Sequence, residues 1–324
     1  MTPNELSAST QLGTVPAAIA AQGNRRALEF QTLLLIAATY AGWLAVTYSY
    51  LHWSLLAVAP LTAFFITLHS SLQHEIVHGH PTRWRALNRL LVVPPLSLWL
   101  PFDCYRMSHH RHHIDARLTD PLDDPESYYW RAEDLARQPA LGRALLQAQQ
   151  TLAGRILIGP FWSIGSFFYS EALALWRNEQ GLLPIWVEHL IWCIPVIVWV
   201  KLVCGIPLWI YLLTMAVPAN AVQLMRSFAE HRARPSPSER IAVVEGSWIL
   251  GPIFLFNNLH SLHHESPAIP WYELPGRYRQ ARARLLAENG GLVYRTYFDV
   301  ARRYLFTAHD KLLHPTGGVP RKSP

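Results

Sequence analysis

The residues of this chain best suited to chemistry are its histidines, which recur in short clusters with a repeated spacing. Eleven of the 16 histidines lie in 74-HEIVHGH-80, 109-HHRHH-113 and 260-HSLHH-264 or at the isolated His231. Residues three and four positions apart share one face of a helix, so each cluster can direct several imidazoles at one point. His110 falls off the face of its cluster, and we exclude it from the candidate ligands.

The repeated H-x-x-H-H and H-x-x-x-H spacings favour a metal site over a basic membrane-surface patch, because arginine would serve such a patch better and would need no fixed spacing. Imidazole binds iron, copper and zinc alike. One tetrahedral zinc ion takes four ligands, fewer than these clusters offer. The count therefore predicts two metal ions, without choosing the element, and no catalytic residue beyond the metal ligands. The candidate ligands are His74, His78, His109, His112, His113, His231, His260, His263 and His264.

The first cluster also matches H-E-x-x-H, the signature of zinc metalloproteases, in which Glu75 would act as the base. An intramembrane protease of this kind would hold one zinc ion and would leave both H-x-x-H-H clusters unexplained. In the two-metal interpretation Glu75 lies about 100° from the ligand face, and we expect it to hydrogen-bond a ligand histidine. His80 is a further candidate for such a supporting contact.

The five remaining histidines stand alone in the sequence, and we expect them to be ordinary polar residues at the surface. His69 precedes His74 by five residues, so it is also a candidate for a contact with a ligand. The five are His52, His69, His189, His309 and His314.

Long apolar segments must position these clusters. The chain is 51% hydrophobic and 15% charged, whereas soluble proteins are about 25% charged. No Asp, Glu, Lys or Arg occurs between Glu29 and Glu75 or between Lys201 and Arg226. Since a helix needs about 20 apolar residues to cross a bilayer, we predict an all-α integral membrane protein. Its four transmembrane helices form two hairpins at about residues 30–48, 53–73, 186–203 and 207–225.

Two further apolar runs, residues 90–102 and 156–176, are interrupted by proline or glycine, and we expect both to be helices lying at the membrane interface. With four spans, every Lys and Arg except Lys201 falls on one side. Positively charged loops stay in the cytoplasm, which predicts that both termini and a histidine-rich cap lie there, at a bacterial inner membrane. A metal transporter would instead place its ligands inside the spans.

The net charge of +6 then reflects topology and attraction to anionic lipid, so nucleic acid is not an expected partner. The predicted organisation is a mobile tail at 1–27, one membrane domain at 28–315 and a C-terminal tail at 316–324. Three cysteines, Cys104, Cys193 and Cys204, predict neither a disulfide framework nor a thiolate metal cage, as suits a reducing compartment.

Two charged segments follow the second and third clusters. The acidic run 119-TDPLDDPESYY-129 is typical of a proline-punctuated turn; alternatively it orders the ligands of the second cluster or meets a donor protein. The basic run 276-GRYRQARARLL-286 predicts an amphipathic helix on lipid headgroups, and docking of an acidic ferredoxin is the alternative.

The clusters 74-HEIVH-78, 109-HHRHH-113 and 260-HSLHH-264 resemble, in order and spacing, the three histidine boxes of the membrane fatty acid desaturase superfamily. The resemblance covers about residues 30–275. His231, 29 residues before the third cluster, resembles the isolated extra ligand upstream of the third box. The run 267-PAIPWYELP-275 is similar to the segment after that box in bacterial desaturases and carotenoid ketolases.

This resemblance implies a di-iron centre held by the nine histidines, with zinc able to replace iron in purified protein. It implies that O2 and two electrons from a ferredoxin or cytochrome b5-type donor attack an unactivated C–H bond of a lipid chain. Relatives place an Asn four residues before the isolated histidine to hold a metal-bound water. This chain has Ser227 there, so Asn257 or Asn258 substitutes, or the water is absent.

The outcome of the C–H attack is not specified by the boxes. Fatty-acyl desaturation is the favoured reaction. Carotenoid ketolation or hydroxylation, hydroxylation of an alkane or fatty acid, and oxidative decarboxylation of a fatty acid would share the same metal core.

Overall fold

Four helices dominate the computed structural model, which describes residues 28–315; the tails predicted at 1–27 and 316–324 lie outside the described residues. These helices are long and apolar enough to cross a membrane, and each has 22 or 23 residues. At 1.5 Å per residue they extend about 33 Å, enough for a bilayer core. The four predicted spans are confirmed, at Phe30–Leu51, Leu55–Val77, Leu182–Val203 and Leu208–Glu230.

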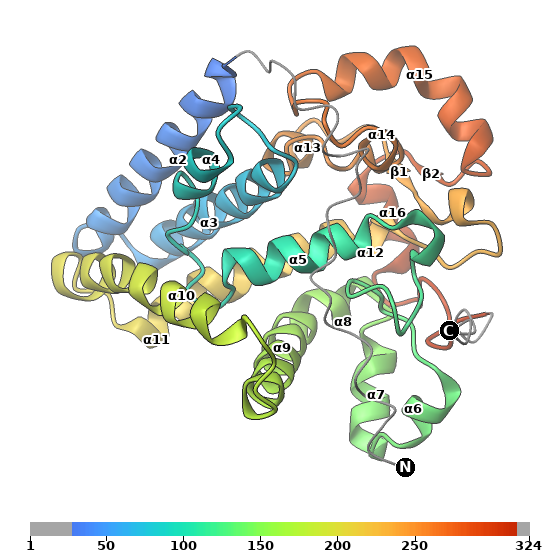
Figure 1. Cartoon of the computed structure of the whole chain (residues 1–324), viewed down its shortest axis with the longest axis horizontal. Helices are drawn as coiled ribbons and strands as arrows, with labels where there is room; N and C mark the ends of the chain where they lie inside the picture. Colours follow the sequence, from blue (N-terminus) through green and yellow to red (C-terminus); the bar gives the residue numbers. More distant parts are fainter. Residues whose placement is uncertain (1–27, 316–324) are drawn as a thin grey trace.

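The first hairpin consists of α2 (Phe30–Tyr48) and α3 (Leu55–Val77), which pack side by side (Figure 1). In the second hairpin, each span changes its helical pitch. The third span is α10 (Leu182–Ile197) followed by a π-helical segment, Val198–Val203. The fourth is α11 (Leu208–Tyr211), a π-helical segment (Leu212–Ala216) and α12 (Val217–Glu230).

A proline accompanies each π-helical segment. Pro195 lies inside α10, just before the first of them. Pro218 lies in the first turn of α12 and has no N–H to donate to the carbonyl of Thr214, in the second segment. Wider helical turns commonly accommodate such interruptions.

The turns of the two hairpins meet at one end of the helices. Gly205 has a φ of 68°, a left-handed conformation that favours glycine. A Cβ at this position would lie 3.7 Å from the side chain of Leu51 in the other turn. The opposite ends of all four spans therefore face the rest of the chain.

Tyr211 joins the two hairpins within the apolar core. This side chain is fully buried. Its hydroxyl accepts a hydrogen bond from Trp43 Nε1 at 3.0 Å and donates one to the Leu96 carbonyl at 2.6 Å. The irregular segment that contains Leu96 is thereby fixed between the hairpins.

That segment corrects one prediction. Residues 90–102 do not form an interfacial helix, because α4 (Arg85–Leu90) ends where the run begins and α5 (Phe102–His112) begins where it ends. The adjacent Pro94 and Pro95 provide no N–H donors, and Leu98 has a positive φ of 66°. Neither feature is compatible with a continuous helix.

The second apolar run does form a helix. After α8 (Leu152–Leu157), α9 (Gly159–Trp176) begins with Pro160 in its first turn, where a missing N–H is tolerated. It is not among the four candidate spans. Phe161, Tyr169 and Trp176 are exposed along it, and its contact with the membrane interface stays a prediction.

Shorter elements form a cap at the open end of the hairpins, where Figure 1 shows α14, α15 and α16 on the side of the molecule away from the hairpin turns. Two short strands pair in parallel, with Val243 opposite Val293. The remaining helices and strands are α6 (Ala132–Ala136), α7 (Ala140–Ala148), α13 (Leu250–Ile253), α14 (His260–Glu265), α15 (Leu274–Glu288), α16 (Tyr297–Tyr304), β1 (Val243–Val244) and β2 (Val293–Tyr294). Three 3₁₀ segments lie at Ser49–Leu51, Asp115–Arg117 and Pro237–Arg240.

Candidate metal centre

The clustered histidines lie in short helical turns or at helix ends. The last turn of α3 carries His74, and His78 caps that helix. The last turn of α5 contributes its histidines in the same way, and His231 follows directly after α12. The third cluster forms the short helix α14. Helical spacing therefore aligns the rings within each cluster, while the packing of the helix ends brings the clusters together.

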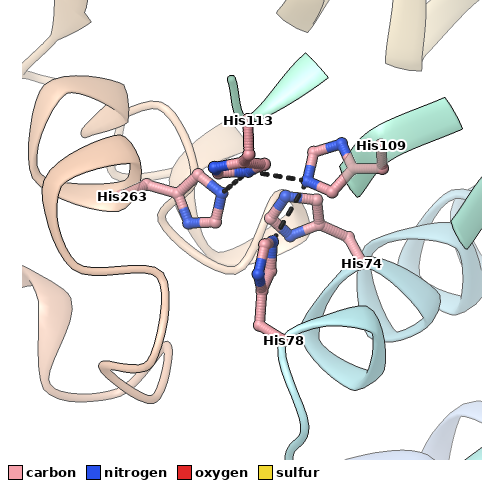
Figure 2. Close-up of side chains that lie close together, drawn as sticks. All are labelled: His74, His78, His109, His113 and His263. Atoms are coloured by element: carbon pink, nitrogen blue, oxygen red, sulfur yellow. Dashed lines mark hydrogen bonds between the residues drawn. The ribbon is translucent and has the colours of Figure 1, made fainter. Parts of the chain in front are cut away.

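Five histidines converge in a first group, shown in Figure 2: His74, His78, His109, His113 and His263. Their ligand atoms all lie within 4.8 Å of one another. His109 Nε2 lies 3.0 Å from His78 Nε2 and 2.9 Å from His113 Nε2. Two nitrogens bound at right angles to one metal, each about 2.1 Å from it, would be about 3 Å apart. These separations match that spacing.

Four histidines form a second group: His112, His231, His260 and His264. His231 Nε2 lies 3.0 Å from His112 Nε2 and 2.9 Å from His260 Nε2. The groups are adjacent, since the rings of His113 and His264 stack with centroids 4.3 Å apart. All nine predicted ligands thus lie in one of the two groups, and His110 lies in neither.

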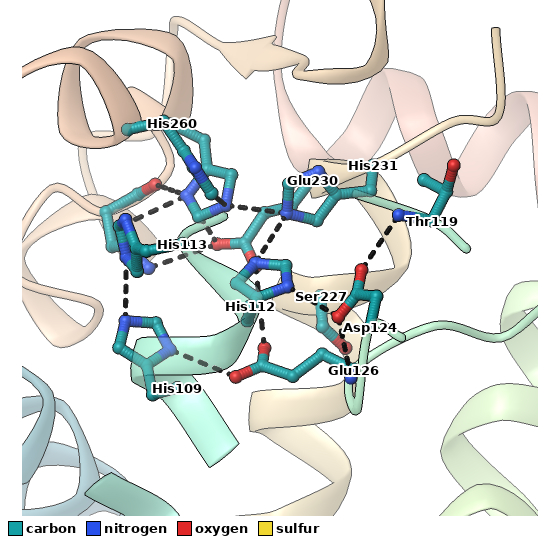
Figure 3. Close-up of polar contacts among 12 residues, drawn as sticks. His109, His112, His113, Thr119, Asp124, Glu126, Ser227, Glu230, His231 and His260 are labelled. Atoms are coloured by element: carbon teal, nitrogen blue, oxygen red, sulfur yellow. Dashed lines mark hydrogen bonds and ion pairs between the residues drawn. The ribbon is translucent and has the colours of Figure 1, made fainter. Parts of the chain in front are cut away.

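Hydrogen bonds on the outer side of several rings determine which nitrogen faces inward. His112 Nδ1 donates to Asp124 Oδ1 at 2.9 Å, and His109 Nδ1 donates to Glu126 Oε1 at 3.0 Å (Figure 3). An ionised carboxylate can only accept, so the proton of each neutral ring lies on Nδ1. The lone pair of Nε2 then points into the group, as in carboxylate–histidine–metal arrangements.

Burial sets the charge state of most of these imidazoles. It lowers the pKa of His109, and it lowers well below the ordinary value the pKa of His78, His113, His231, His260, His263 and His264. His112 is the exception. Burial works against its charge, but the carboxylates of Glu126 and Asp124 outweigh that effect and raise its pKa to about 9. Burial also opposes the charge of Glu126, yet His112 and His109 hold its pKa well below the usual range.

The donor set fits a pair of transition-metal ions. His74 Nε2 is buried and has no hydrogen-bond partner among the described residues, although an unpaired buried nitrogen is costly. Mostly neutral nitrogens with inward lone pairs are what iron, copper or zinc binds. Five donors in the first group exceed the four that zinc usually takes, which favours a metal of higher coordination number.

The predicted supporting residues of the first cluster are both buried. Glu75 Oε2 lies 3.6 Å from His80 Nε2, and His80 Nδ1 bonds Glu29 Oε1 at 2.6 Å. This contact of Glu29 with the first cluster was not expected from the sequence. The sequence offered one hint of this contact, because Glu29 directly precedes a long uncharged run. A carboxylate at the point where the chain enters the membrane needs a polar partner.

Three further residues were named as candidates for holding a water. Ser227 Oγ is engaged by the Tyr128 hydroxyl at 2.7 Å and donates to the Leu224 carbonyl. Asn257 Oδ1 lies 3.2 Å from His260 Nδ1, on the outer side of that ring. Asn258 Nδ2 donates to the Val244 carbonyl at 2.6 Å.

The acidic run 119–129 forms turns, as predicted. It also orients the second cluster, the alternative that the sequence left open, because it supplies the two carboxylates that bond His112 and His109. A third acid was missed. Glu230, buried in the last turn of α12, lies 3.5 Å from His260 Nδ1 and forms an ion pair with Arg226 at 3.1 Å. Its place next to His231 was the only hint in the sequence.

The prediction for the solitary histidines was correct only for His52, which is exposed. The other four are buried, and in each of them a ring nitrogen has a hydrogen-bond partner. His69 contacts the Tyr40 hydroxyl and His189 the Leu98 carbonyl. His309 pairs with the Tyr294 hydroxyl, and His314 with the Thr119 hydroxyl.

The basic run 276–286 is helical, within α15. Three of its arginines are paired with carboxylates: Arg277 with Glu273, Arg282 with Glu245, and Arg284 with Glu265 and Glu288. The positive charge that this helix offers to lipid or to a donor protein is therefore smaller than the sequence suggests.

A comparison with models of protein families gives a match. The family model described as fatty acid desaturase matches residues 51–298, a stretch that contains every histidine of both groups. No curated protein matches the chain.

Proposed function

Because the chain belongs to the fatty acid desaturase family, we propose that it is a membrane oxidoreductase that introduces a double bond into a fatty-acyl chain at a di-iron centre. The observation that carries this proposal is the convergence of nine imidazoles into two adjacent groups at the ends of membrane-spanning helices. A zinc protease built on the first cluster would leave the second group without a role.

The ligands of the first iron would be the five histidines of the first group, and those of the second iron the four of the second group. When bound, the iron ions would supply the activation of O2 that breaks an unactivated C–H bond. Desaturation removes two hydrogens from neighbouring carbons while O2 is reduced to two water molecules, which requires two further electrons and two protons. We propose a ferredoxin or cytochrome b5-type protein as the electron donor.

The chain itself orients the ligands and limits the access of water. Asp124 and Glu126 hold the rings of His112 and His109, and Asn257 holds that of His260. Most of the ligand rings are buried, which protects an oxidising centre from water and stray reductants. These contacts support a preorganised centre whose ligands need little rearrangement to bind metal.

The position of the centre supports a lipid substrate. His74 lies in the last turn of α3 and His231 directly follows the fourth span, so the groups lie where the chain leaves the membrane. An acyl chain can approach this point from the bilayer without crossing water. We further propose that this end of the protein faces the cytoplasm. Among the lysines and arginines whose positions the structure describes, only Lys201 lies near the opposite end, and positive loops stay inside.

The test is an assay of the purified protein, reloaded with ferrous iron, in acyl-lipid vesicles with a reductant and O2. The metal content of the same sample is measured, since zinc acquired during purification would leave the enzyme inactive. We expect an acyl product that has lost two hydrogens, detected by mass spectrometry. A hydroxylated product, or turnover of a carotenoid in place of the acyl lipid, would refute the desaturase assignment and support one of its relatives. A single zinc ion with peptidase activity would refute the family mechanism.

A further inference from the structure

The two groups of histidines are unequal. The first offers five nitrogen donors and the second only four. Ser227, four residues before His231, was one candidate for holding a metal-bound water there. Ser227 is occupied by Tyr128 and by a backbone carbonyl. If an oxygen ligand completes the coordination of a metal in the second group, a polar side chain other than Ser227 must supply or hold it.

Glu126 occupies a distinctive position between the groups (Figure 3). Its Oε1 accepts from His109 Nδ1 at 3.0 Å, on the outer side of a ring of the first group. Its Oε2 lies 3.9 Å from His112 Nε2. That nitrogen is the inward, ligand atom of the second group, because His112 Nδ1 already donates to Asp124. One carboxylate thus contacts a ring of the first group on its outer side and lies near a ligand nitrogen of the second group.

The other polar residues around the second group contact its rings from the outer side. Asp124 bonds His112 Nδ1, and Asn257 and Glu230 lie beside His260 Nδ1. Nδ1 of His231 is near the Arg240 carbonyl, at 3.3 Å. Among these described contacts, only that of Glu126 reaches a ligand nitrogen.

We propose that Glu126 completes the second metal site by holding a water molecule in its open coordination position. This inference rests on the proposed function, since it requires a metal in the second group. Two donors of one metal, each about 2.1 Å from it, are separated by at most about 4.2 Å. Glu126 is not part of the set whose ligand atoms all lie within 4.8 Å, which favours a bridging water over direct ligation.

Two further features of Glu126 suit this role. Its side chain is 27% exposed, so water can reach it although the neighbouring His112 is buried. Its backbone N–H donates to Asp124 Oδ1 at 2.9 Å, which couples its position to the residue that orients His112. A water bound to a metal is a strong hydrogen-bond donor, and an ionised carboxylate is the matching acceptor.

The variant Glu126→Gln distinguishes the holding of a metal-bound water from the hydrogen bond that Glu126 makes to His109. The amide oxygen can still accept from His109 Nδ1, whereas the amide nitrogen cannot accept a hydrogen bond from a metal-bound water. The purified full-length protein is stripped of metal and titrated with Co²⁺, with binding followed by visible absorption and by elemental analysis. Glu133→Gln is the matched control, because its side chain is 67% exposed on α6.

We expect the wild type and Glu133→Gln to bind two Co²⁺ ions. In Glu126→Gln we expect one ion to bind as before and the other about 10-fold to 100-fold more weakly, with a changed visible spectrum because its coordination number falls. The inference would be overturned if Glu126→Gln bound both ions as tightly as the wild type does, or if it bound both of them equally more weakly. If Glu126→Gln does not fold, Glu126→Asp takes its place. Its shorter side chain withdraws the carboxylate from the second group, so weaker binding of one ion is again expected, and unchanged binding of both ions would overturn the inference. Fewer than two ions in the wild type would instead contradict the proposed function.

Discussion

At the scale of single residues, neighbours in the sequence belong to different histidine groups. His112 and His113 lie in different groups, as do His263 and His264. Consecutive residues of a helix point about 100° apart, so one turn between the two groups can supply a ligand to each. This geometry explains why H-x-x-H-H recurs. The first and last histidines of the motif share a helix face and belong to one group, and the histidine between them belongs to the other group.

This arrangement predicts separable losses of metal. His263→Ala removes a donor of the first group only, and His264→Ala removes one of the second only. Each variant is expected to bind one of its two ions more weakly and to lose it during purification, because that site has lost one donor. Elemental analysis of metal per chain checks this expectation. His52→Ala, at an exposed histidine far along the chain from either group, is the control and should retain both ions. Loss of both ions in each variant would contradict separate sites.

At the scale of elements, the junction between α7 and α8 depends on close backbone contact. A Cβ at Gly154 would lie 2.0 Å from the Ala148 carbonyl oxygen and 2.4 Å from its carbon. Neither atom can rotate away as a side chain would. Gly165 in α9 is the opposite case, because a Cβ there would meet no atom within 4 Å.

These two glycines should respond to alanine with opposite sign. Gly154→Ala is expected to lower the free energy of unfolding by at least about 1–3 kcal/mol, because the backbone must shift to relieve the overlap. Gly165→Ala should raise it by about 0.5–1 kcal/mol, since alanine is the better helix former. Thermal unfolding of the purified protein in detergent measures both changes. Similar midpoints for the two variants would show that the α7–α8 contact is looser than described.

At the scale of the whole molecule, both hairpin turns lie at one end of the spans and the histidine groups at the other. His52 is exposed in the first turn, and among the lysines and arginines of residues 28–315 only Lys201 lies near this end. Arg137 is 71% exposed in the cap. The rule that positive loops stay inside then predicts that position 52 is accessible from outside the cell and position 137 is not.

Labelling of single cysteines tests this orientation. We expect His52→Cys to react with a membrane-impermeant maleimide in intact cells, and Arg137→Cys to react only after lysis. The native cysteines, Cys104, Cys193 and Cys204, are all buried, so the unsubstituted protein serves as the control with low background. The reverse pattern would place the metal centre outside the cell and exclude a cytoplasmic electron donor.

Much of this architecture could be predicted from the sequence because it follows local rules. Charge-free runs of sufficient length specified the four spans, and i, i+3, i+4 spacing specified which histidines share a face. Leu90–Phe102 could not be assigned correctly on that basis, since its hydrophobicity resembles a helix although Pro94, Pro95 and Leu98 prevent one. Burial of solitary histidines such as His309 was also unforeseen, because it depends on a partner, Tyr294, supplied by another part of the fold.

By itself, the sequence determined that this protein crosses a membrane four times and carries clustered imidazoles at the ends of its spans. It did not determine how the nine histidines divide into sets of five and four, or that Glu126 and Asp124 support them. Those facts belong to the tertiary structure alone. A helix controls direction only over one or two turns, whereas His78 and His263, or His112 and His231, become neighbours only when helices distant in the sequence pack with their ends together.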